Sequence, residues 1–365
     1  MCPKLHRFID VAVPVKACNL RCHYCYITHN RLFNTRISDV AHSKENVRKS
    51  FSQRVLGGVC LINLCGEGET LLLDKMPDYI EAILSNGHFI SLVTNGTVTK
   101  SLKRIAELPP EYLERLFIKF SFHYLELKKR GLLEQFCKNV RMLRDAGASF
   151  TVEVTPSDEL LPYISDVIEI SKREFGAVCH VTVARDERNK ASIPILSKMS
   201  LDEYKRVWGA FNSPLFDFKI SVFGIKQKSF CCAGEWTYFL SLETGQLFQC
   251  YGCGALQNIF ATPPKPLKSL PVGHFCPLPH CYNAHVFMSL GTIADVKAPT
   301  YEVLRNRVCE DGSEWLRPKM KAFLSQKLYA NNPPKPFFAR LVSDVRFVGA
   351  ACSGALKRLC KKIFR

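Results

Sequence analysis

The segment Cys18-Asn19-Leu20-Arg21-Cys22-His23-Tyr24-Cys25 places three cysteines within eight residues, directly after the apolar run from Phe8 to Pro14. Three thiolates in so short a loop can surround one cubane iron–sulfur cluster, whose fourth iron then has no protein ligand. A small molecule must complete the coordination of that iron. The chain has seventeen cysteines, and in a reducing compartment clustered cysteines more often ligate metal than form structural disulfides. The loop therefore predicts an iron–sulfur site that is open to a small ligand.

Two other interpretations of this loop are a zinc site and three unrelated thiols. Zinc sites usually combine one C-x2-C pair with a distant second pair, and these three cysteines have no fourth partner nearby in the sequence. The spacing by itself does not decide between the interpretations. The rest of the chain has to supply the supporting motifs.

Strand-like and helix-like segments alternate through the first 200 residues. The six expected strands are 8–14, 58–64, 88–94, 116–122, 149–155 and 178–184, and the expected helices include 75–85, 125–146 and 159–175. Six β–α units in series imply a parallel sheet with right-handed crossovers. We expect an α/β fold, a partial (β/α)6 TIM-like barrel with a small cysteine-rich α+β domain, and chemistry on the loops after the strands.

Short polar motifs follow the expected strands in order. Gly66-Glu67-Gly68-Glu69-Thr70 follows the second strand, Thr94-Asn95-Gly96 follows the third, Ser121 ends the fourth and Glu153 lies in the fifth. Each alone is an ordinary turn or a polar residue at a strand end. Together with the C-x3-C-x2-C loop they resemble the radical S-adenosylmethionine (SAM) superfamily over about residues 8–185. Glu67 and Thr70 depart from the Gly-Gly-Glu-Pro form of the family's loop.

The resemblance implies cofactors and residue roles. Cys18, Cys22 and Cys25 would hold a [4Fe–4S] cluster whose open iron chelates the amino and carboxylate groups of SAM. An electron donor such as flavodoxin or ferredoxin would then drive cleavage of SAM to a 5′-deoxyadenosyl radical, which removes a hydrogen atom from the substrate. Glu69 is expected to accept a hydrogen bond from the SAM ammonium. The expected SAM-binding residues are Tyr24, Gly66, Gly68, Glu69, Thr94, Asn95, Ser121 and Glu153.

A second group of cysteines lies within about fifty residues. Cys231-Cys232-Ala233-Gly234 is followed by Gly245 and, after four more residues, by Cys250. Residues 243–246 suit the turn of a β-hairpin that carries Cys250 at its end. This arrangement resembles the opening of the SPASM and twitch extensions of radical SAM enzymes. The resemblance implies one auxiliary [4Fe–4S] cluster, as in a twitch domain.

The expected ligands of the auxiliary cluster are Cys231, Cys250, Cys276 and Cys281. Cys253 is an alternative to one of them, because Cys250 and Cys253 form a chelating C-x2-C pair. A structural zinc ribbon is the alternative to the cluster as a whole. An auxiliary cluster would carry electrons or bind substrate, and the sequence does not separate these roles.

The composition divides the chain into four parts: the barrel at 1–210, the auxiliary-cluster domain at 211–295, a helical cap at 296–332 and a basic tail at 333–365. Apolar residues recur every three or four positions in the tail, which predicts an amphipathic helix with an interruption around 349–354. Eight lysines and arginines accompany a single acidic residue, Asp344, between 335 and 365. Such a helix suits either peripheral contact with an anionic membrane or packing against the protein's own surface.

The formal charge of +17 favours phosphorylated or polyanionic partners. No recognition motif with interleaved aromatic residues appears, so no specific nucleic acid is expected. The leading expectation is an oxidoreductase or epimerase that acts on a nucleotide- or lipid-linked sugar in surface polysaccharide synthesis. A peptide or protein substrate is the alternative. Peptide-modifying relatives often have a leader-binding domain before the barrel, and we expect none here because the cysteine loop begins at residue 18.

A hypothesis of another kind is a non-catalytic iron–sulfur or zinc protein that senses redox state or scaffolds partners. The ordered motifs after the strands argue against it, because a sensor needs no SAM pocket. The sequence shows neither a secretory signal nor a run of about 18 apolar residues. The expected location is the cytoplasm, with the tail at the inner face of the membrane.

Overall fold

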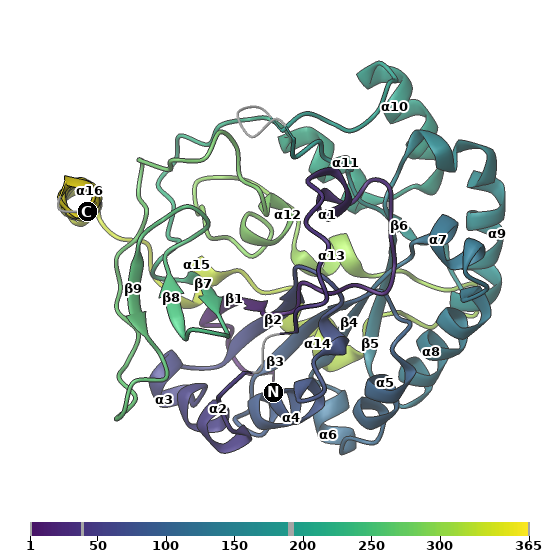
Figure 1. Cartoon of the computed structure of the whole chain (residues 1–365), viewed down its shortest axis with the longest axis horizontal. Coiled ribbons are helices and arrows are strands. Elements are labelled where there is room, and N and C mark those ends of the chain that lie inside the picture. The colour runs from purple at the N-terminus through teal and green to yellow at the C-terminus, as the bar shows by residue number, and fades with distance from the viewer. Residues whose placement is uncertain (1, 38–39, 189–192, 364–365) are drawn as a thin grey trace.

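The structure is a computed structural model that describes residues 2–37, 40–188 and 193–363. Within these residues nine strands form one sheet, in the order β6-β5-β4-β3-β2-β1-β7-β8-β9 (Figure 1). Strands β1 to β6 pair in parallel, β7 pairs in parallel with the other edge of β1, and β8 and β9 are antiparallel. The strands are β1 Arg7–Val13, β2 Cys60–Gly66, β3 Phe89–Thr94, β4 Leu116–Ser121, β5 Ser149–Val154, β6 His180–Val181, β7 Thr237–Ser241, β8 Gln246–Phe248 and β9 Ala255–Asn258.

The six consecutive parallel strands confirm the predicted partial TIM-like barrel. Helices α4 to α9 cover the outer side of the sheet (Figure 1). The helices are α1 Tyr26–His29, α2 Lys44–Ser50, α3 Gln53–Leu56, η1 Thr70–Leu72, α4 Met76–Leu84, α5 Thr99–Ala106, α6 Pro110–Leu113, α7 Tyr124–Lys129, α8 Leu133–Asp145, η2 Asp158–Tyr163, α9 Ile164–Phe175, α10 Leu201–Trp208, η3 Gly209–Phe211, α11 Pro214–Val222, α12 Ala284–Phe287, α13 Tyr301–Arg305, α14 Pro318–Leu324, α15 Leu328–Asn331 and α16 Phe337–Ile363.

Three expected helices differ from the structure. The expected helix at 159–175 is a 3-10 helix, η2, followed by α9. The expected helix at 125–146 is two helices, α7 and α8, because Gly131 between them has a φ of +66°, which ends the first one. The interruption expected around 349–354 is wrong, since α16 is continuous from Phe337 to Ile363. A single glycine inside a helix costs only about 1 kcal/mol, which good helix formers around it offset. Phe364 and Arg365, at the end of the tail, lie outside the described residues.

The interior of the barrel is layered, because alternate residues of a strand point to the same face. Near the start of the strands, Phe8, Leu61, Phe89 and Phe117 form an apolar cluster with α14, whose Phe323 ring stacks on Phe89 with centroids 3.7 Å apart. Two residues further along the same faces stand the polar residues Asp10, Asn63, Ser91 and Lys119, all buried. The apolar layer closes one end of the barrel, and the polar layer leads to the carboxyl ends of the strands.

The cysteine-rich segment joins the barrel sheet. Strand β7 aligns Phe8 with Thr237 and Ala12 with Ser241, and the hairpin of β7 and β8 continues the sheet outward. The division of the chain near residue 210 therefore stays a proposal about domains. None of the helices in the described part of the chain is long and apolar enough to span a membrane.

Candidate active site

The cysteine loop after β1 is joined to the glycine loop after β2 through the backbone. The N–H of Gly68 donates to the carbonyl of Val15 at 2.7 Å, and the N–H of Glu69 donates to the carbonyl of Ala17 at 2.9 Å. A side chain at position 68 would place its Cβ 1.9 Å from the oxygen of Ala17. Only glycine permits this close approach, which explains why the loop needs glycine there.

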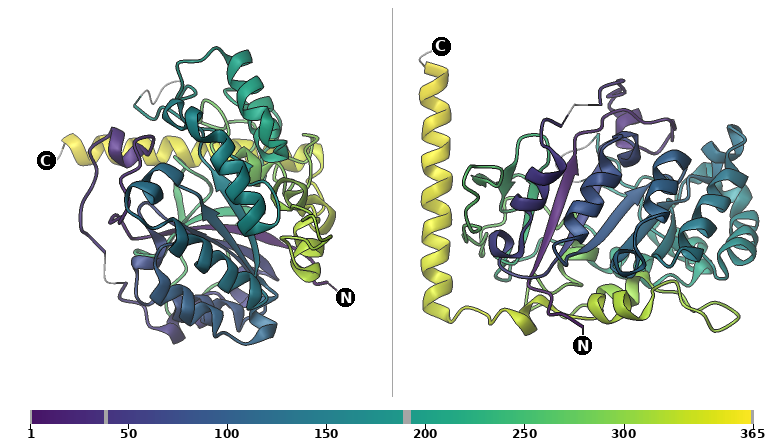
Figure 2. Two further views of the ribbon diagram at one scale, coloured as in Figure 1. Left: turned by 90° about the vertical axis from the view of Figure 1, so that its right-hand side faces the viewer. Right: turned by 90° about the horizontal axis from the view of Figure 1, so that it is seen from below.

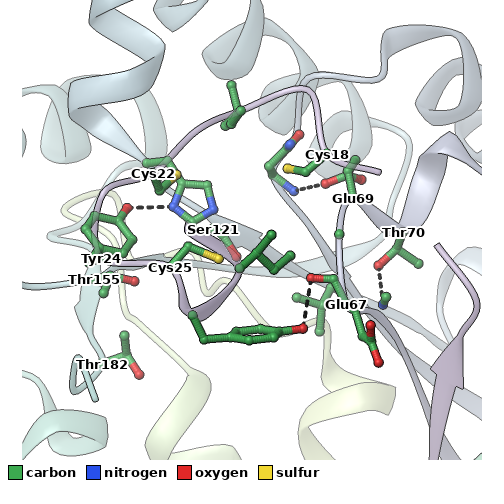
Figure 3. A pocket seen from close by; sticks show the side chains of 18 of the residues that line it. Cys18, Cys22, Tyr24, Cys25, Glu67, Glu69, Thr70, Ser121, Thr155 and Thr182 are labelled. Carbon is green, nitrogen blue, oxygen red and sulfur yellow. Dashed lines mark hydrogen bonds between the residues drawn. The ribbon is translucent and has the colours of Figure 1, made fainter. Parts of the chain in front are cut away.

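The two loops form the wall of a cavity of about 260 Å³ at the carboxyl ends of the strands. Figure 3 shows the three cysteine side chains around this cavity, with Glu69 beside Cys18. The cavity is lined by Cys18, Cys22, Cys25 and by seven of the eight expected SAM-binding residues: Tyr24, Gly66, Gly68, Glu69, Thr94, Asn95 and Ser121. The structure thus brings together residues from the loops after four strands.

Glu69 is the carboxylate at the centre of this wall, and only 2% of it is exposed. Its Oε1 accepts hydrogen bonds from the Thr94 hydroxyl at 2.6 Å and from the N–H of Leu71 at 3.0 Å, and its Oε2 accepts from the N–H of Asn95 at 2.7 Å. Burial raises the pKa of the carboxyl, and these three donors act in the opposite direction. Oε2 keeps an unused acceptor position, which a cationic ligand in the cavity would satisfy.

The donor set fits the cofactors that the sequence predicts. Three thiols and one buried carboxylate face the same space, and burial raises the pKa of each thiol while neighbouring thiols add to this effect for Cys18 and Cys22. Iron would remove the protons from such thiols, because a metal binds the thiolate form. The three cysteines would then hold the cluster, and Glu69 would hold the ammonium group of SAM.

Tyr24 is fixed at the cavity wall by a histidine that the sequence analysis did not single out. The Tyr24 hydroxyl and the His123 Nδ1 are 2.7 Å apart. Burial lowers the pKa of His123 to about 4, so its ring is neutral at neutral pH. His123 therefore positions Tyr24 without bringing a charge to the site.

A second cavity of about 510 Å³, here called the inner cavity, adjoins the first and shares Gly66, Ser121 and Thr182 with it. Its floor is made by alternate residues of the strands, including Asp10, Asn63 and Lys119. Its other walls are Lys219 on α11, His285 on α12, Arg305 on α13, and Tyr251 and Asn283 in loops.

Glu153 lies in this inner cavity instead of among the other expected SAM-binding residues. Its carboxylate forms an ion pair with Arg305, whose side chain is 1% exposed. Cys65 also lines the inner cavity. His285 is buried there too, and burial next to Lys219 and Arg305 lowers its pKa well below the usual range.

The four expected auxiliary ligands, Cys231, Cys250, Cys276 and Cys281, line a third, small cavity of about 30 Å³. Cys253 lines a different, outer cavity with residues of α16. Burial raises the pKa of the Cys231 thiol to about 12, and the nearby thiols of Cys276 and Cys253 contribute. Among the residues that the structure describes, no three His, Cys, Asp or Glu side chains are close enough to hold a single metal ion. The ligand sets therefore stay predictions.

The inner-cavity residues were missed because their signal is weak in the sequence. Asp10, Asn63 and Lys119 are single polar residues inside apolar strands, in RFIDVAV, CLINLCG and LFIKFS. Polar residues on the same face of three strands in a row would have indicated a polar interior. Lys219, Tyr251 and Arg305 come from distant segments, and nothing near them in the sequence connects them to the barrel.

A partial α/β barrel with three cysteines and a buried carboxylate at the carboxyl ends of its strands defines an enzyme that combines an iron–sulfur cluster with a small cationic ligand. Residues 13–156 match the family model of the radical SAM superfamily, and this match supports the prediction of a radical SAM enzyme. The match over these residues indicates an enzyme and implies SAM and a [4Fe–4S] cluster as its cofactors. No curated protein matches the sequence.

Solved structures share the fold. SuiB from Streptococcus suis bound to the precursor peptide SuiA is 14% identical, with a TM-score of 0.50 over 82% of this chain and 70% of that one. SuiB bound to S-adenosylmethionine is 13% identical, with a TM-score of 0.49, and the match covers 70% of this chain and 63% of SuiB. Native anSMEcpe with bound AdoMet is 16% identical, with a TM-score of 0.46, covering 69% of this chain and 78% of that one. At these identities the likeness shows the fold alone.

Proposed function

We propose that the protein is a radical SAM enzyme that abstracts a hydrogen atom from a substrate held in the inner cavity. When bound and reduced by a donor such as flavodoxin or ferredoxin, the cluster with SAM supplies a 5′-deoxyadenosyl radical. The observation that carries the proposal is the shared wall of the two cavities at Gly66, Ser121 and Thr182. A substrate in the inner cavity would meet the SAM site there.

Different residues of the chain would bind the cluster, SAM and the substrate. Cys18, Cys22 and Cys25 hold the cluster, Glu69 orients the SAM ammonium, and Ser121 lies where SAM and substrate meet. Glu153 would belong to the substrate side, because it lines the inner cavity and is paired with Arg305. Cys231, Cys250, Cys276 and Cys281 would hold an auxiliary cluster beside the inner cavity, since Tyr251 lines both that cavity and theirs.

The proposed substrate is a nucleotide- or lipid-linked sugar of surface polysaccharide synthesis, which the enzyme epimerises or oxidises. The polar lining of the inner cavity and the formal charge of +17 support a phosphorylated carbohydrate. A peptide is the alternative substrate, because SuiB binds the precursor peptide SuiA. Epimerisation needs a hydrogen donor to the substrate radical, and the Cys65 thiol lines the inner cavity. Incorporation of one solvent deuterium into the product would indicate epimerisation, and its absence would indicate oxidation.

The test of the function is anaerobic reconstitution, reduction by dithionite with SAM, and assay of 5′-deoxyadenosine and iron. We expect about eight irons per chain and release of deoxyadenosine. Cys22→Ala should lose about four irons and all SAM cleavage, whereas Cys231→Ala should lose about four irons and keep the SAM-binding cluster. Cys352→Ala, at an exposed thiol on α16, is the matched control. Intact SAM with a full complement of iron would overturn the enzyme proposal in favour of a sensor, and bound zinc would indicate a scaffold.

We also propose that α16 places the protein on the inner face of an anionic membrane. Figure 2 shows this helix running along one side of the body. Asp344 holds it there through His274, with 2.8 Å between Oδ2 and Nδ1, and Arg340 pairs with Asp295 at 2.9 Å. The opposite side of the helix is apolar and between 41% and 79% exposed at Phe337, Phe338, Leu341, Val342, Val345 and Val348. An exposed apolar face on a basic helix is the pattern of a membrane-surface helix.

Sedimentation with lipid vesicles tests the proposed binding of α16 to an anionic membrane. The full chain should bind vesicles that contain phosphatidylglycerol and not vesicles of phosphatidylcholine alone. Phe338→Glu with Val345→Glu should abolish binding, while Leu201→Glu, at an exposed apolar position on α10, should not. A concentration-dependent dimer that the double variant disrupts, without vesicle binding, would contradict the membrane proposal.

A further inference from the structure

We propose that the inner cavity binds a phosphate group of the substrate through the ammonium groups of Lys119 and Lys219. This inference rests on the proposed function and names the chemistry that the substrate site recognises. Lys119 comes from β4 and is 8% exposed, and Lys219 comes from α11. The two side chains enter the same cavity from the strand floor and from the helical wall.

Two of the three carboxylates that line the inner cavity, Asp10 and Glu153, are already satisfied, and the third, Glu67, is 56% exposed and lies 3.9 Å from the Lys16 ammonium. Asp10 accepts hydrogen bonds from the Asn63 amide at 2.7 Å, from the Asn283 amide at 3.1 Å and from the Tyr251 hydroxyl. Glu153 is bound to Arg305. These contacts fix the two carboxylates against the walls, so neither is free to pair with a lysine.

The two lysines have only neutral partners among the described residues. The Nζ of Lys119 donates to the Asn63 carbonyl at 2.8 Å, and the Nζ of Lys219 donates to the Thr182 hydroxyl. Neither forms an ion pair in the part of the chain that the structure describes. A buried cation without a counter-charge is costly, and an anionic ligand removes this cost.

The charged groups around Lys219 are mostly positive, which favours binding of an anion beside it. Arg185 after β6, Arg305 on α13 and Lys119 on β4 face it with positive charge, and Glu153 on β5 is its sole negative neighbour among the charges that act on it. His285 on α12 also faces it and is neutral because its own pKa is lowered. Burial and these cations lower the pKa of Lys219 to about 7.

Phosphate is the anion that suits this site best. Two ammonium groups match the charge of a phosphate dianion, and lysine binds phosphate as a point charge. A carboxylate carries one charge and would leave the second lysine unmatched. Thr182, which accepts from Lys219, belongs to the wall shared with the SAM cavity. A phosphate on Lys219 would thus hold the adjoining part of the substrate near the SAM site.

Binding of phosphate should be accompanied by uptake of a proton by Lys219, because the pKa of Lys219 is lowered in the empty site. At pH 8 the empty site holds Lys219 mostly deprotonated, and a bound dianion favours the ammonium form. Binding at pH 8 should therefore take up close to one proton, and affinity should fall as pH rises above 7. At pH 6 Lys219 is already protonated, so its proton uptake should vanish.

Isothermal titration of the anaerobically reconstituted protein tests the inference, with inorganic phosphate, pyrophosphate and glucose 1-phosphate as separate probes and succinate as the dicarboxylate control. Titration in two buffers of different ionisation enthalpy measures proton uptake. Lys219→Met and Lys119→Met should each weaken phosphate binding at least about tenfold, and Lys219→Met should abolish the proton uptake. Lys205→Met, at an exposed lysine on α10, should change neither the phosphate affinity nor the proton uptake. Lys219→Arg should keep most of the affinity that Lys219→Met loses.

Three outcomes would overturn the inference: no phosphate binding by the wild-type protein, binding that Lys219→Met leaves unchanged, or succinate binding as tight as that of phosphate. Glucose 1-phosphate binding more tightly than inorganic phosphate would identify a sugar phosphate as the source of the group. Substrate-free SAM cleavage is measured on the same samples. Cleavage without phosphate binding would reject this inference and leave the proposed function standing.

Discussion

The carboxylate of Glu69 connects three parts of the site. Its oxygens accept hydrogen bonds from Leu71 in η1, from Thr94 at the end of β3 and from Asn95 in the loop after it. In Glu69→Gln, the amide nitrogen at the position of Oε2 would face the N–H of Asn95, so that two donors oppose each other. An unsatisfied buried donor costs about 1–3 kcal/mol, so we expect a loss of that size in unfolding free energy. SAM binding should also weaken, because the amide cannot accept from the SAM ammonium as a carboxylate does.

Chemical denaturation and titration with SAM measure these two effects of Glu69→Gln separately. Glu67→Gln is the matched control, since the Glu67 side chain lies in the same loop and is 56% exposed. Equal stability and equal SAM affinity in the Glu69 and Glu67 variants would contradict the role given to Glu69.

The contact between the cysteine loop and the glycine loop depends on Gly68. In Gly68→Ala the new methyl group would lie 1.9 Å from the carbonyl oxygen of Ala17, so the two loops would have to separate. Because Cys18 directly follows Ala17, we expect this variant to lose the first cluster, about four irons per chain. Iron analysis and electron paramagnetic resonance of the reduced protein measure the loss. Gly209→Ala, whose Cβ would meet no atom within 4 Å, should retain all iron.

The sequence predicted well those segments that a short run of neighbouring residues defines. The apolar runs predicted β1 to β5, and seven residues of the motifs after them line one cavity. Prediction from neighbouring residues failed where backbone geometry sets a helix boundary or where the pairing of strands sets the position of a side chain. Gly131 splits one expected helix, and Glu153 lies in the inner cavity, where it pairs with Arg305 from a distant segment. Only the pairing of the strands shows that Asp10, Asn63 and Lys119 form one polar layer.

The cavity at Cys18, Cys22 and Cys25, the inner cavity and the cavity at the second group of cysteines adjoin one another in this order. Gly66, Ser121 and Thr182 belong to both the SAM cavity and the inner cavity, and Tyr251 belongs to both the inner cavity and the auxiliary one. A molecule in the inner cavity would lie between the two groups of cysteines. This order is consistent with oxidation as well as with epimerisation, so the fate of the substrate radical depends on residues such as Cys65.

The ion pair between Arg305 and Glu153 holds the C-terminal cap on the barrel across 152 residues of sequence. Arg305→Met should destabilise the protein by about 3–5 kcal/mol, because it leaves the carboxylate of Glu153 buried without its partner. Adding Glu153→Gln should recover part of this loss, since the double variant leaves neither member of the pair charged. Denaturation of the wild type, both single variants and the double variant gives the coupling energy between the two residues. A coupling energy near zero would show that the cap is held by its apolar contacts, such as Phe323 on Phe89, and not by the ion pair.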